Sequence, residues 1–502
     1  MTAMWITIGV YIACLVAVGI VTGRSSKSIS DITVGGRRAG AWLSALSYGT
    51  AYFSAVMFVG YAGSTGYGFG LWGVLVGLGN MVFGTLLAWL LLARRTRALA
   101  ARWDLHTMPE FLEKFYGSRA MKLFACLVIF IFFVPYSASV YKGLGSIAQV
   151  LLGISDTAFM VIIAALAALL LLFGGYLVQA RADFVQGIIM FIGVAFLIFF
   201  VVRSKDVGGL SGLAEYAKTP EGLPKLNGQQ VWGLLSLLLM TSFGTWGLPH
   251  MIQKYFGIRS DEQARRGIWI SSVFSLLVAG GGYFIGSLCY KFFTRADLDA
   301  LAAEKGPAFK DYIMPMMLDK ANLPAVLLGI VFVLLLAASV STLCSITLTS
   351  SSILVKDFIG TLRPKIPEKK LGLGIKLLCV LFIGVSYFVA NSQTPILDLM
   401  SYSWGIISGS FLAPYVLALY YKGMNKTGAW GGILTGFCIA LVPATCKLLT
   451  VAGVTAEAVV KLAGQGPQFA VVAAVCSLLM CFALSAAANA AGKGQKEAAA
   501  AA

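Results

Sequence analysis

Apolar stretches of about 20 residues recur along the whole chain, and short polar or basic segments separate them. A membrane-spanning helix needs about 20 mostly apolar residues, so this pattern predicts an all-α protein that crosses a membrane many times. We expect about thirteen transmembrane helices, near residues 4–23, 41–63, a third that ends at 92, 123–153, 157–177, 183–202, 231–255, 268–290, 333–357, 377–390, 396–421, 429–449 and 469–488.

Two of the expected spans contain sequences that interrupt a helix. The second span carries Gly49 within the polar run 47–50, and the seventh carries the segment 244–249 with two glycines and Pro249. Close helix packing explains isolated glycines, but proline also removes a hydrogen bond from the helix ladder. Interrupted spans in corresponding positions of two halves mark the binding site of a transporter, because they free backbone carbonyls near the middle of the membrane. We therefore expect both breaks to face one site.

The ninth span starts as an apolar helix and then becomes rich in serine and threonine. Lipid offers a hydroxyl no partner, so we expect this span inside the helix bundle. Four of its residues share one helix face at the spacing i, i+3, i+4 and i+7, namely Ala338, Ser341, Thr342 and Ser345. Hydroxyl and freed carbonyl oxygens are hard ligands that suit a small monovalent cation, and not zinc or copper. The alternative is that the hydroxyls only tie helices together.

Composition agrees with a membrane protein and excludes other classes. Hydrophobic residues make up 59% of the chain and charged residues 12%. The net charge of +17 does not indicate nucleic-acid binding, because Lys and Arg gather in every second loop between apolar runs. By the positive-inside rule, this alternation places the N-terminus outside and the C-terminus in the cytoplasm of a multi-pass plasma-membrane protein.

Catalytic chemistry finds little support in the sequence. There are two histidines, and the nine cysteines are scattered without a paired spacing, so a histidine-based metal or catalytic site is not expected. The chain has no HExxH motif and no GxSxG nucleophile turn, and we expect no enzyme. No soluble segment is long enough to fold alone, so we expect one transmembrane domain over residues 1–490 and a disordered, alanine-rich tail over 491–502.

Five segments of the chain carry recognisable motifs, in this order: Asp31 with Gly35, Gly36 and Arg37; residues 47–63; Gly174 and Gly175 followed by 183–187; Gly247, Leu248, Pro249 and His250; and residues 337–357. Together they resemble the motifs of the sodium:solute symporter family, which includes bacterial proline and pantothenate permeases, sialic acid symporters and sodium-glucose cotransporters. The resemblance implies a leucine-transporter-type fold. Such a fold has two inverted five-helix repeats, here residues 41–203 and 231–421, with one helix before them and two after.

The resemblance also implies a sodium (Na⁺) site. Its ligands would be the backbone carbonyls of Thr50, Phe53 and Ala338 and the hydroxyls of Ser341 and Thr342. Some family members bind a second sodium, and Asp183 and Ser345 match that site. Cys344, however, stands where a serine is usual. Asp183 would otherwise steer ions toward the cytoplasmic exit or pair with Arg181.

The solute pocket implied by the resemblance lies between the broken helices and the third core helix. Its lining would be Tyr52, Ser54, Met57, Tyr136, Trp246 and Trp404. Tyr52 replaces the aspartate that proline permeases carry there, whereas the pantothenate branch has a tyrosine. Lys142 is an intramembrane cation that binds a solute carboxylate, extends its charge to the membrane surface or has a structural partner.

The sequence therefore predicts a sodium-coupled secondary symporter that imports a small organic solute with a carboxylate, such as proline, pantothenate or a monocarboxylate. The expected partners are this solute, sodium and the lipid bilayer, with no nucleic acid, and we expect a monomer. The alternatives are a sugar or sialic acid symporter of the same fold, or a proton-coupled or passive transport protein.

Overall fold

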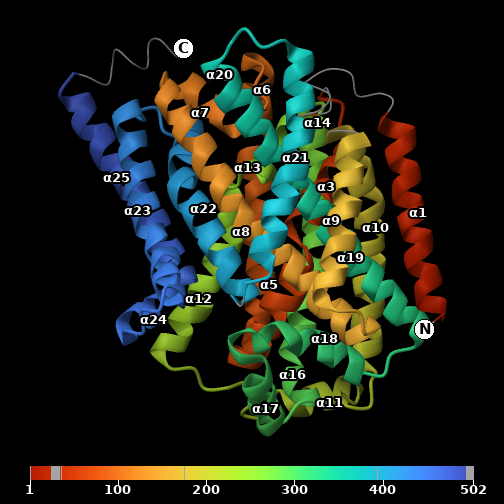
Figure 1. Ribbon diagram of the computed structural model, residues 1–502. Coiled ribbons are helices and arrows are strands. Elements are labelled where there is room, and N and C mark those ends of the chain that lie inside the picture. The colour runs from red at the N-terminus through yellow and green to blue at the C-terminus, as the bar shows by residue number, and fades with distance from the viewer. Residues whose placement is uncertain (1, 24–33, 35–36, 174–175, 393, 493–502) are drawn as a thin grey trace.

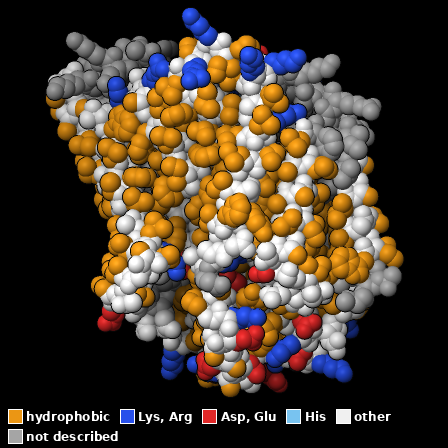
Figure 2. Space-filling model, in the orientation of Figure 1, with side chains coloured by type: hydrophobic (Ala, Val, Ile, Leu, Met, Phe, Trp, Pro, Cys, Tyr) orange, Lys and Arg blue, Asp and Glu red, His pale blue; other side chains and the backbone are white. Residues whose placement is uncertain are grey.

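The computed structural model describes residues 2–23, 34, 37–173, 176–392 and 394–492. All regular elements in these ranges are helices, which confirms the predicted all-α class. They form one bundle (Figure 1). Hydrophobic side chains cover the middle of its visible face, and Lys and Arg side chains gather at the end that carries α6 (Arg94–Trp103) and α20 (Gly360–Leu362) (Figure 2). An apolar belt between polar ends is the surface that a bilayer requires.

Most long helices coincide with predicted spans. They are α1 (Thr2–Gly23), α8 (Arg119–Leu152), α9 (Asp156–Phe173), α10 (Tyr176–Val202), α14 (Asp261–Ser275), α19 (Ala325–Ser352), α21 (Glu368–Ala390), α22 (Ile396–Tyr420), α23 (Lys426–Val451) and α25 (Gly466–Ala490). Within the described ranges, 9 helices are long and apolar enough to cross a membrane, or 10 if one bent pair counts as a single span. The expected number of about thirteen stays a prediction.

Short helices lie together at the end of the bundle opposite α20 (Figure 1). They are α11 (Gly209–Tyr216), α16 (Cys289–Phe292), α17 (Arg295–Lys305) and α18 (Lys310–Lys320). Helix α1 begins at this end, whereas α25 finishes at the opposite end (Figure 1). The two termini of the described chain are therefore on opposite sides of the apolar belt.

The first broken helix is interrupted later than expected. The run 47–50 and Gly49 lie inside α3 (Ala41–Tyr52), so the prediction that they interrupt the helix was wrong. The helix ends at Tyr52, Phe53 has an extended backbone, and a π-helical segment, η2 (Val56–Ala62), continues the span. A side chain on Gly49 would meet the ring of Phe274 at 2.4 Å, so this glycine permits close packing against α14 and does not break the helix.

The second broken helix confirms the prediction for segment 244–249. Helix α12 (Gly228–Phe243) passes into a short 3₁₀ turn, η6 (Gly244–Trp246), and α13 (Pro249–Phe256) leaves it at an angle of 42°. A Cβ atom on Gly247 would lie 2.9 Å from the Cα of Ser408 and 3.0 Å from the backbone nitrogen of Leu412. Glycine is therefore needed where α22 crosses the break.

A backbone bridge joins the segments that flank the two broken helices. Ala39, just before α3, pairs with Ile258, just after α13, as an isolated parallel β-bridge. The amide of Ala39 donates to the carbonyl of Gly257 at 3.1 Å, and the amide of Arg259 donates to the carbonyl of Ala39 at 3.0 Å. The start of the first broken span and the end of the second are thus held together.

Helix α19 lies at the centre of the bundle and packs against α10, α8, α1, α21 and α3. Every residue from 331 to 353 is buried, which confirms that the hydroxyl-rich span is not exposed to lipid. The repeat boundaries and the single-domain division stay predictions. Asp31, Gly35, Gly36, Gly174 and Gly175, and the predicted tail from residue 493 on, lie outside the described residues.

Candidate functional site

The hydroxyl of Thr342 on α19 contacts the end of α3, where the first broken helix frees its carbonyls. Its Oγ1 atom lies 3.1 Å from the carbonyl oxygen of Thr50, 3.2 Å from that of Ala51 and 3.0 Å from that of Ala338. One hydroxyl cannot donate to three acceptors at full strength. This cluster of oxygens therefore has spare capacity for a cation.

Ser341 extends the cluster toward a carboxylate. Its Oγ atom lies 3.0 Å from the Oγ1 of Thr50 and 2.6 Å from the Oδ1 of Asp183 on α10. Thr50, Asp183, Ser341 and Thr342 are at most 1% exposed. Three helices thus bring hydroxyl, carbonyl and carboxylate oxygens to one buried point, and these ligands fit a small hard cation.

The predicted sodium ligands mostly come together here, with one addition. Phe53 follows α3 directly, where a helix end leaves carbonyls without helical partners. The amide of Ala55 donates to the Oγ of Ser339 at 3.1 Å, so α19 also binds the backbone of the break. The sequence did not predict Ala51 as a ligand, because Ala51 contributes its backbone carbonyl and its methyl side chain gives no sign of this role.

Asp183 is paired with Lys254 of α13. The distance between Nζ of Lys254 and Oδ2 of Asp183 is 3.1 Å, and the two side chains are 2% and 0% exposed. Ser47 donates to the same carboxylate oxygen and accepts from Lys254 at 2.8 Å. The sequence analysis did not single out Lys254, which α13 turns into the protein interior. Arg181, the alternative partner for Asp183 in the sequence analysis, is exposed.

Ser345, the other residue matched to a second sodium site, has a hydrogen-bond partner within the protein. The side-chain amide of Gln179 donates to the hydroxyl of Ser345. A cavity of about 10 Å³ lies beside Asp183 and Cys344, with Leu170 and Leu171 among its other lining residues. That volume is about the minimum that one water molecule needs.

Three of the predicted solute-pocket residues form an aromatic cluster between α3, α8 and α22. The ring centroids of Tyr136 and Trp404 lie 5.7 Å apart, and those of Tyr52 and Trp404 lie 6.1 Å apart. His250, at the start of α13, joins them at 5.6 Å from Tyr136. The tyrosine Oη of Tyr136, the indole nitrogen of Trp404 and both ring nitrogens of His250 are buried without a hydrogen-bond partner among the described residues.

The remaining pocket candidates have partners within the protein. Tyr52 donates its hydroxyl to the carbonyl of Thr241 at 2.7 Å, and the hydroxyl of Ser54 accepts from the amide of Val56 at 3.2 Å. Met57 is buried in η2. Trp246, in η6, donates to the carbonyl of Phe83 at 2.9 Å.

Lys142 also has a structural partner. Its Nζ donates to the backbone carbonyls of Ser392 and Thr394, the latter at 2.8 Å. The lysine thus holds the segment that leads into α22, which agrees with the structural alternative of the sequence analysis.

Known transporters are similar to this chain in sequence over most of its length. The chain is 29% identical over 458 residues to the osmoregulated proline transporter OpuE of Bacillus subtilis (strain 168), covering 89% of this chain and 90% of that protein. It is 27% identical over 453 residues to sodium/proline symporter 2 of Staphylococcus saprophyticus, covering 87% and 85%.

The fold is similar to that of a solved Na⁺-coupled sialic acid symporter in its substrate-bound outward-open state. The TM-score is 0.77 at 16% identity, and the match covers 97% of both chains. This similarity confirms the predicted leucine-transporter-type fold. The family model of the sodium:solute symporter family matches residues 33–436. That range contains both broken helices and the oxygen cluster on α19, and the chain belongs to the sodium:solute symporter family.

Proposed function

We propose that this chain imports a small carboxylate-bearing solute together with sodium, with an amino acid such as proline as the first candidate. The observation that carries the proposal is the convergence of Thr342 on the carbonyls of Thr50, Ala51 and Ala338. A sodium ion at this point would be held by those carbonyls, that of Phe53, and the hydroxyls of Ser341 and Thr342. In the family, sodium is transported with the solute and is therefore cargo.

Sodium at this position would join α3 to α19. The bound ion would stabilise the arrangement of the break that receives the solute, and the solute would in turn strengthen sodium binding, because such coupling is reciprocal. A membrane potential contributes about 2.3 kcal/mol per charge per 100 mV. One sodium ion therefore supports about a fifty-fold solute gradient per 100 mV, since about 1.4 kcal/mol corresponds to tenfold.

The aromatic cluster supports a solute with a carboxylate and an apolar body. The donors of Tyr136 and Trp404, which have no hydrogen-bond partner in the described part of the chain, are suited to a carboxylate, which only accepts hydrogen bonds when ionised. The rings of Tyr52, Tyr136 and Trp404 would cover an apolar ring such as that of proline. The proline transporters among the relatives support the same choice. Pantothenate, a monocarboxylate, a sugar and sialic acid are the competing solutes.

The chain is a multi-pass plasma-membrane protein, and we propose its orientation from surface charge. Lys and Arg side chains gather at the end of the bundle near α20, where α25 also finishes (Figure 2). By the positive-inside rule this end faces the cytoplasm, and α1 begins outside. We further propose that the transporter works as a monomer.

Uptake of radiolabelled proline into proteoliposomes tests the function. We expect concentrative uptake with an inward sodium gradient and none with potassium in its place. Equal uptake in potassium would contradict sodium coupling, and uptake driven by a proton gradient alone would support the proton-coupled alternative.

A second measurement identifies the solute if proline fails. A ligand that binds the folded state raises the melting temperature by mass action. Pantothenate, monocarboxylates, sugars and sialic acid are compared in sodium and in potassium chloride. The compound that stabilises the protein in sodium chloride but not in potassium chloride identifies the solute class.

A further inference from the structure

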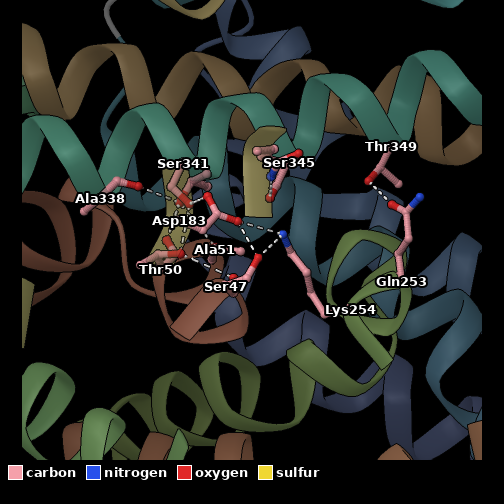
Figure 3. Close-up of polar contacts among 12 residues, drawn as sticks. Ser47, Thr50, Ala51, Asp183, Gln253, Lys254, Ala338, Ser341, Ser345 and Thr349 are labelled. Carbon is pink, nitrogen blue, oxygen red and sulfur yellow. Dashed lines mark hydrogen bonds and ion pairs between the residues drawn. The ribbon is translucent and has the colours of Figure 1, made fainter. Parts of the chain in front are cut away.

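Both carboxylate oxygens of Asp183 are occupied by groups of the protein. Oδ1 accepts a hydrogen bond from Ser341 at 2.6 Å. Oδ2 accepts from the hydroxyl of Ser47 and from Nζ of Lys254, the latter at 3.1 Å (Figure 3). The carboxylate therefore already has a cation and two hydroxyl donors.

An unpaired carboxylate in this position would be strongly unfavourable. Asp183 has no solvent exposure, and a buried charge without a partner destabilises a protein far more than a paired one. Lys254 supplies the compensating charge from α13, and its Nζ also donates to Ser47 on α3 at 2.8 Å. The ammonium group thus makes contacts with oxygens that would otherwise be available to a metal cation.

The groups on the Ser345 side of Asp183 are poor ligands for another sodium ion, so a second ion would have to bind where Lys254 lies, beside Asp183 and Ser47. The hydroxyl of Ser345 accepts a hydrogen bond from Gln179. Cys344 offers sulfur, a soft ligand, where a hard cation needs oxygen. The adjacent cavity of about 10 Å³ is lined partly by Leu170, Leu171 and Val340.

We infer that Lys254 is a tethered cation that occupies the place of a second sodium ion on Asp183, so that the chain couples one sodium ion to each solute. The inference rests on the proposed sodium site between α3 and α19 and adds its stoichiometry. It also assigns Lys254 as a positioning residue, because Lys254 contacts Asp183 and Ser47, and Asp183 in turn contacts the sodium ligand Ser341.

The number of sodium ions decides how far the solute can be concentrated. One ion driven by potential alone supports about a fifty-fold gradient per 100 mV, and two ions would support about the square of that factor. A chain with a tethered cation therefore concentrates its solute less steeply and uses one sodium ion per molecule.

The test is equilibrium binding of radiolabelled sodium to the purified full-length protein. We expect one ion per wild-type chain and a Hill coefficient near one. Lys254→Met leaves Asp183 without a cation, so we expect two ions per chain and a Hill coefficient above one. Lys254→Arg keeps the charge and is expected to bind one ion. Lys254→Met combined with Asp183→Asn removes the carboxylate as well and is also expected to bind one ion.

Two results would overturn the inference: two sodium ions bound to the wild type, or one ion bound to a correctly folded Lys254→Met. If Lys254→Met does not fold, the wild-type count still decides, together with the ratio of sodium to proline flux in proteoliposomes. A wild type that binds no sodium overturns the proposed sodium site itself, and that outcome differs from either result above.

Discussion

The hydroxyl oxygen of Thr342 lies 3.1 Å from the carbonyl oxygen of Thr50, although 292 positions separate the two residues. If these oxygens hold sodium, replacing Ser341 and Thr342 together by alanine removes two of its ligands. We expect the sodium concentration for half-maximal transport to rise at least about tenfold, or ~1.4 kcal/mol in binding free energy. Uptake measured over a series of sodium concentrations checks this.

Thr347 provides a matched control for that substitution. It is a buried threonine on the same helix, and its hydroxyl has no hydrogen-bond partner among the described residues. Thr347→Ala is expected to leave the sodium dependence unchanged. Equal sodium dependence in the double variant and the wild type would rule out the proposed ligands.

Asp183 and Lys254 should depend on each other for stability. Asp183→Asn leaves the buried ammonium of Lys254 without its counter-ion, and breaking a buried pair typically destabilises a protein by about 3–5 kcal/mol. Adding Lys254→Met to Asp183→Asn removes the unpaired charge, so the double variant should melt at a higher temperature than Asp183→Asn alone. Additive losses of stability would show that the pair is not coupled.

Asp183→Asn also tests the role of the carboxylate in transport. The hydrogen-bond partners of Asp183 are Ser341, Ser47 and Lys254, and none of these belongs to the aromatic cluster of Tyr52, Tyr136, His250 and Trp404. We therefore expect a change in sodium dependence and an unchanged order of preference among solutes. A variant with altered solute preference and normal sodium dependence would contradict this role.

Tyr136→Phe separates solute binding from folding. The hydroxyl of Tyr136 has no partner among the described residues, so its loss should not lower the melting temperature without solute. If the hydroxyl binds the solute carboxylate, the solute affinity falls about 10- to 150-fold, because a hydrogen bond to a charged group contributes about 1.5–3 kcal/mol. Solute-dependent thermal shifts and transport assays measure both effects.

Tyr141→Phe is the control for Tyr136→Phe. Tyr141 lies on the same helix, is buried, and also has a hydroxyl without a partner in the described structure. Its substitution should leave solute affinity unchanged. Equal affinity losses in the two variants would argue against a specific contact at Tyr136.

Gly247→Ala should damage the second broken helix. Its Cβ would lie 2.9 Å from the backbone of Ser408, which cannot move without shifting α22. We expect a lower melting temperature and reduced transport. Gly233, on α12, has only side-chain atoms near the position of an added Cβ, the nearest at 3.8 Å, and Gly233→Ala should be tolerated. Normal stability of Gly247→Ala would mean that α22 does not constrain the break.

The stability of the protein should fall as the pH rises toward 7. Burial raises the pKa of Asp311, on α18, to about 7, against a smaller opposing effect of the Ile396 amide and of Lys142. An unfolded aspartate has a pKa of about 3.9. Between these values the folded state binds the extra proton, so the contribution of Asp311 is complete below about pH 4 and is lost as the pH rises through about 7.

Asp311→Asn should remove this part of the pH dependence, and the variant should be more stable than the wild type at about pH 8. Melting temperatures between about pH 5 and 8 measure it, with the exposed Asp319 of the same helix, replaced by asparagine, as the control. Other charged groups around Asp311 are Asp398 and Lys310. An unchanged pH profile in Asp311→Asn would assign the effect to those groups.

The sequence predicted features that depend on local pattern. The all-α class, the break at 244–249 and the buried hydroxyl face of α19 follow from apolar length, proline chemistry and helix periodicity. The first break could not be located, because the contacts that fix it come from far along the chain: Ser339 accepts from Ala55, and Thr342 lies against Thr50 and Ala51.

The partner of Asp183 was missed for a similar reason. Lys254 follows a proline-led turn of helix and resembles the start of a basic loop in sequence. Only the 42° bend between α12 and α13 turns it into the protein, where Asp183 lies 71 positions away in the chain. A charged residue near the end of an apolar run is therefore ambiguous until the helix directions are known.

The bridge between Ala39 and Ile258 is made of backbone atoms, with amides and carbonyls of Ala39, Gly257 and Arg259 as its donors and acceptors. Such a link does not depend on side-chain identity, except that proline at 39 or 259 would remove a donor. Related proteins can therefore replace most side chains on both segments and keep the link. The backbone link between the segments that flank α3 and α13 can therefore be retained in evolution while the surrounding side chains change.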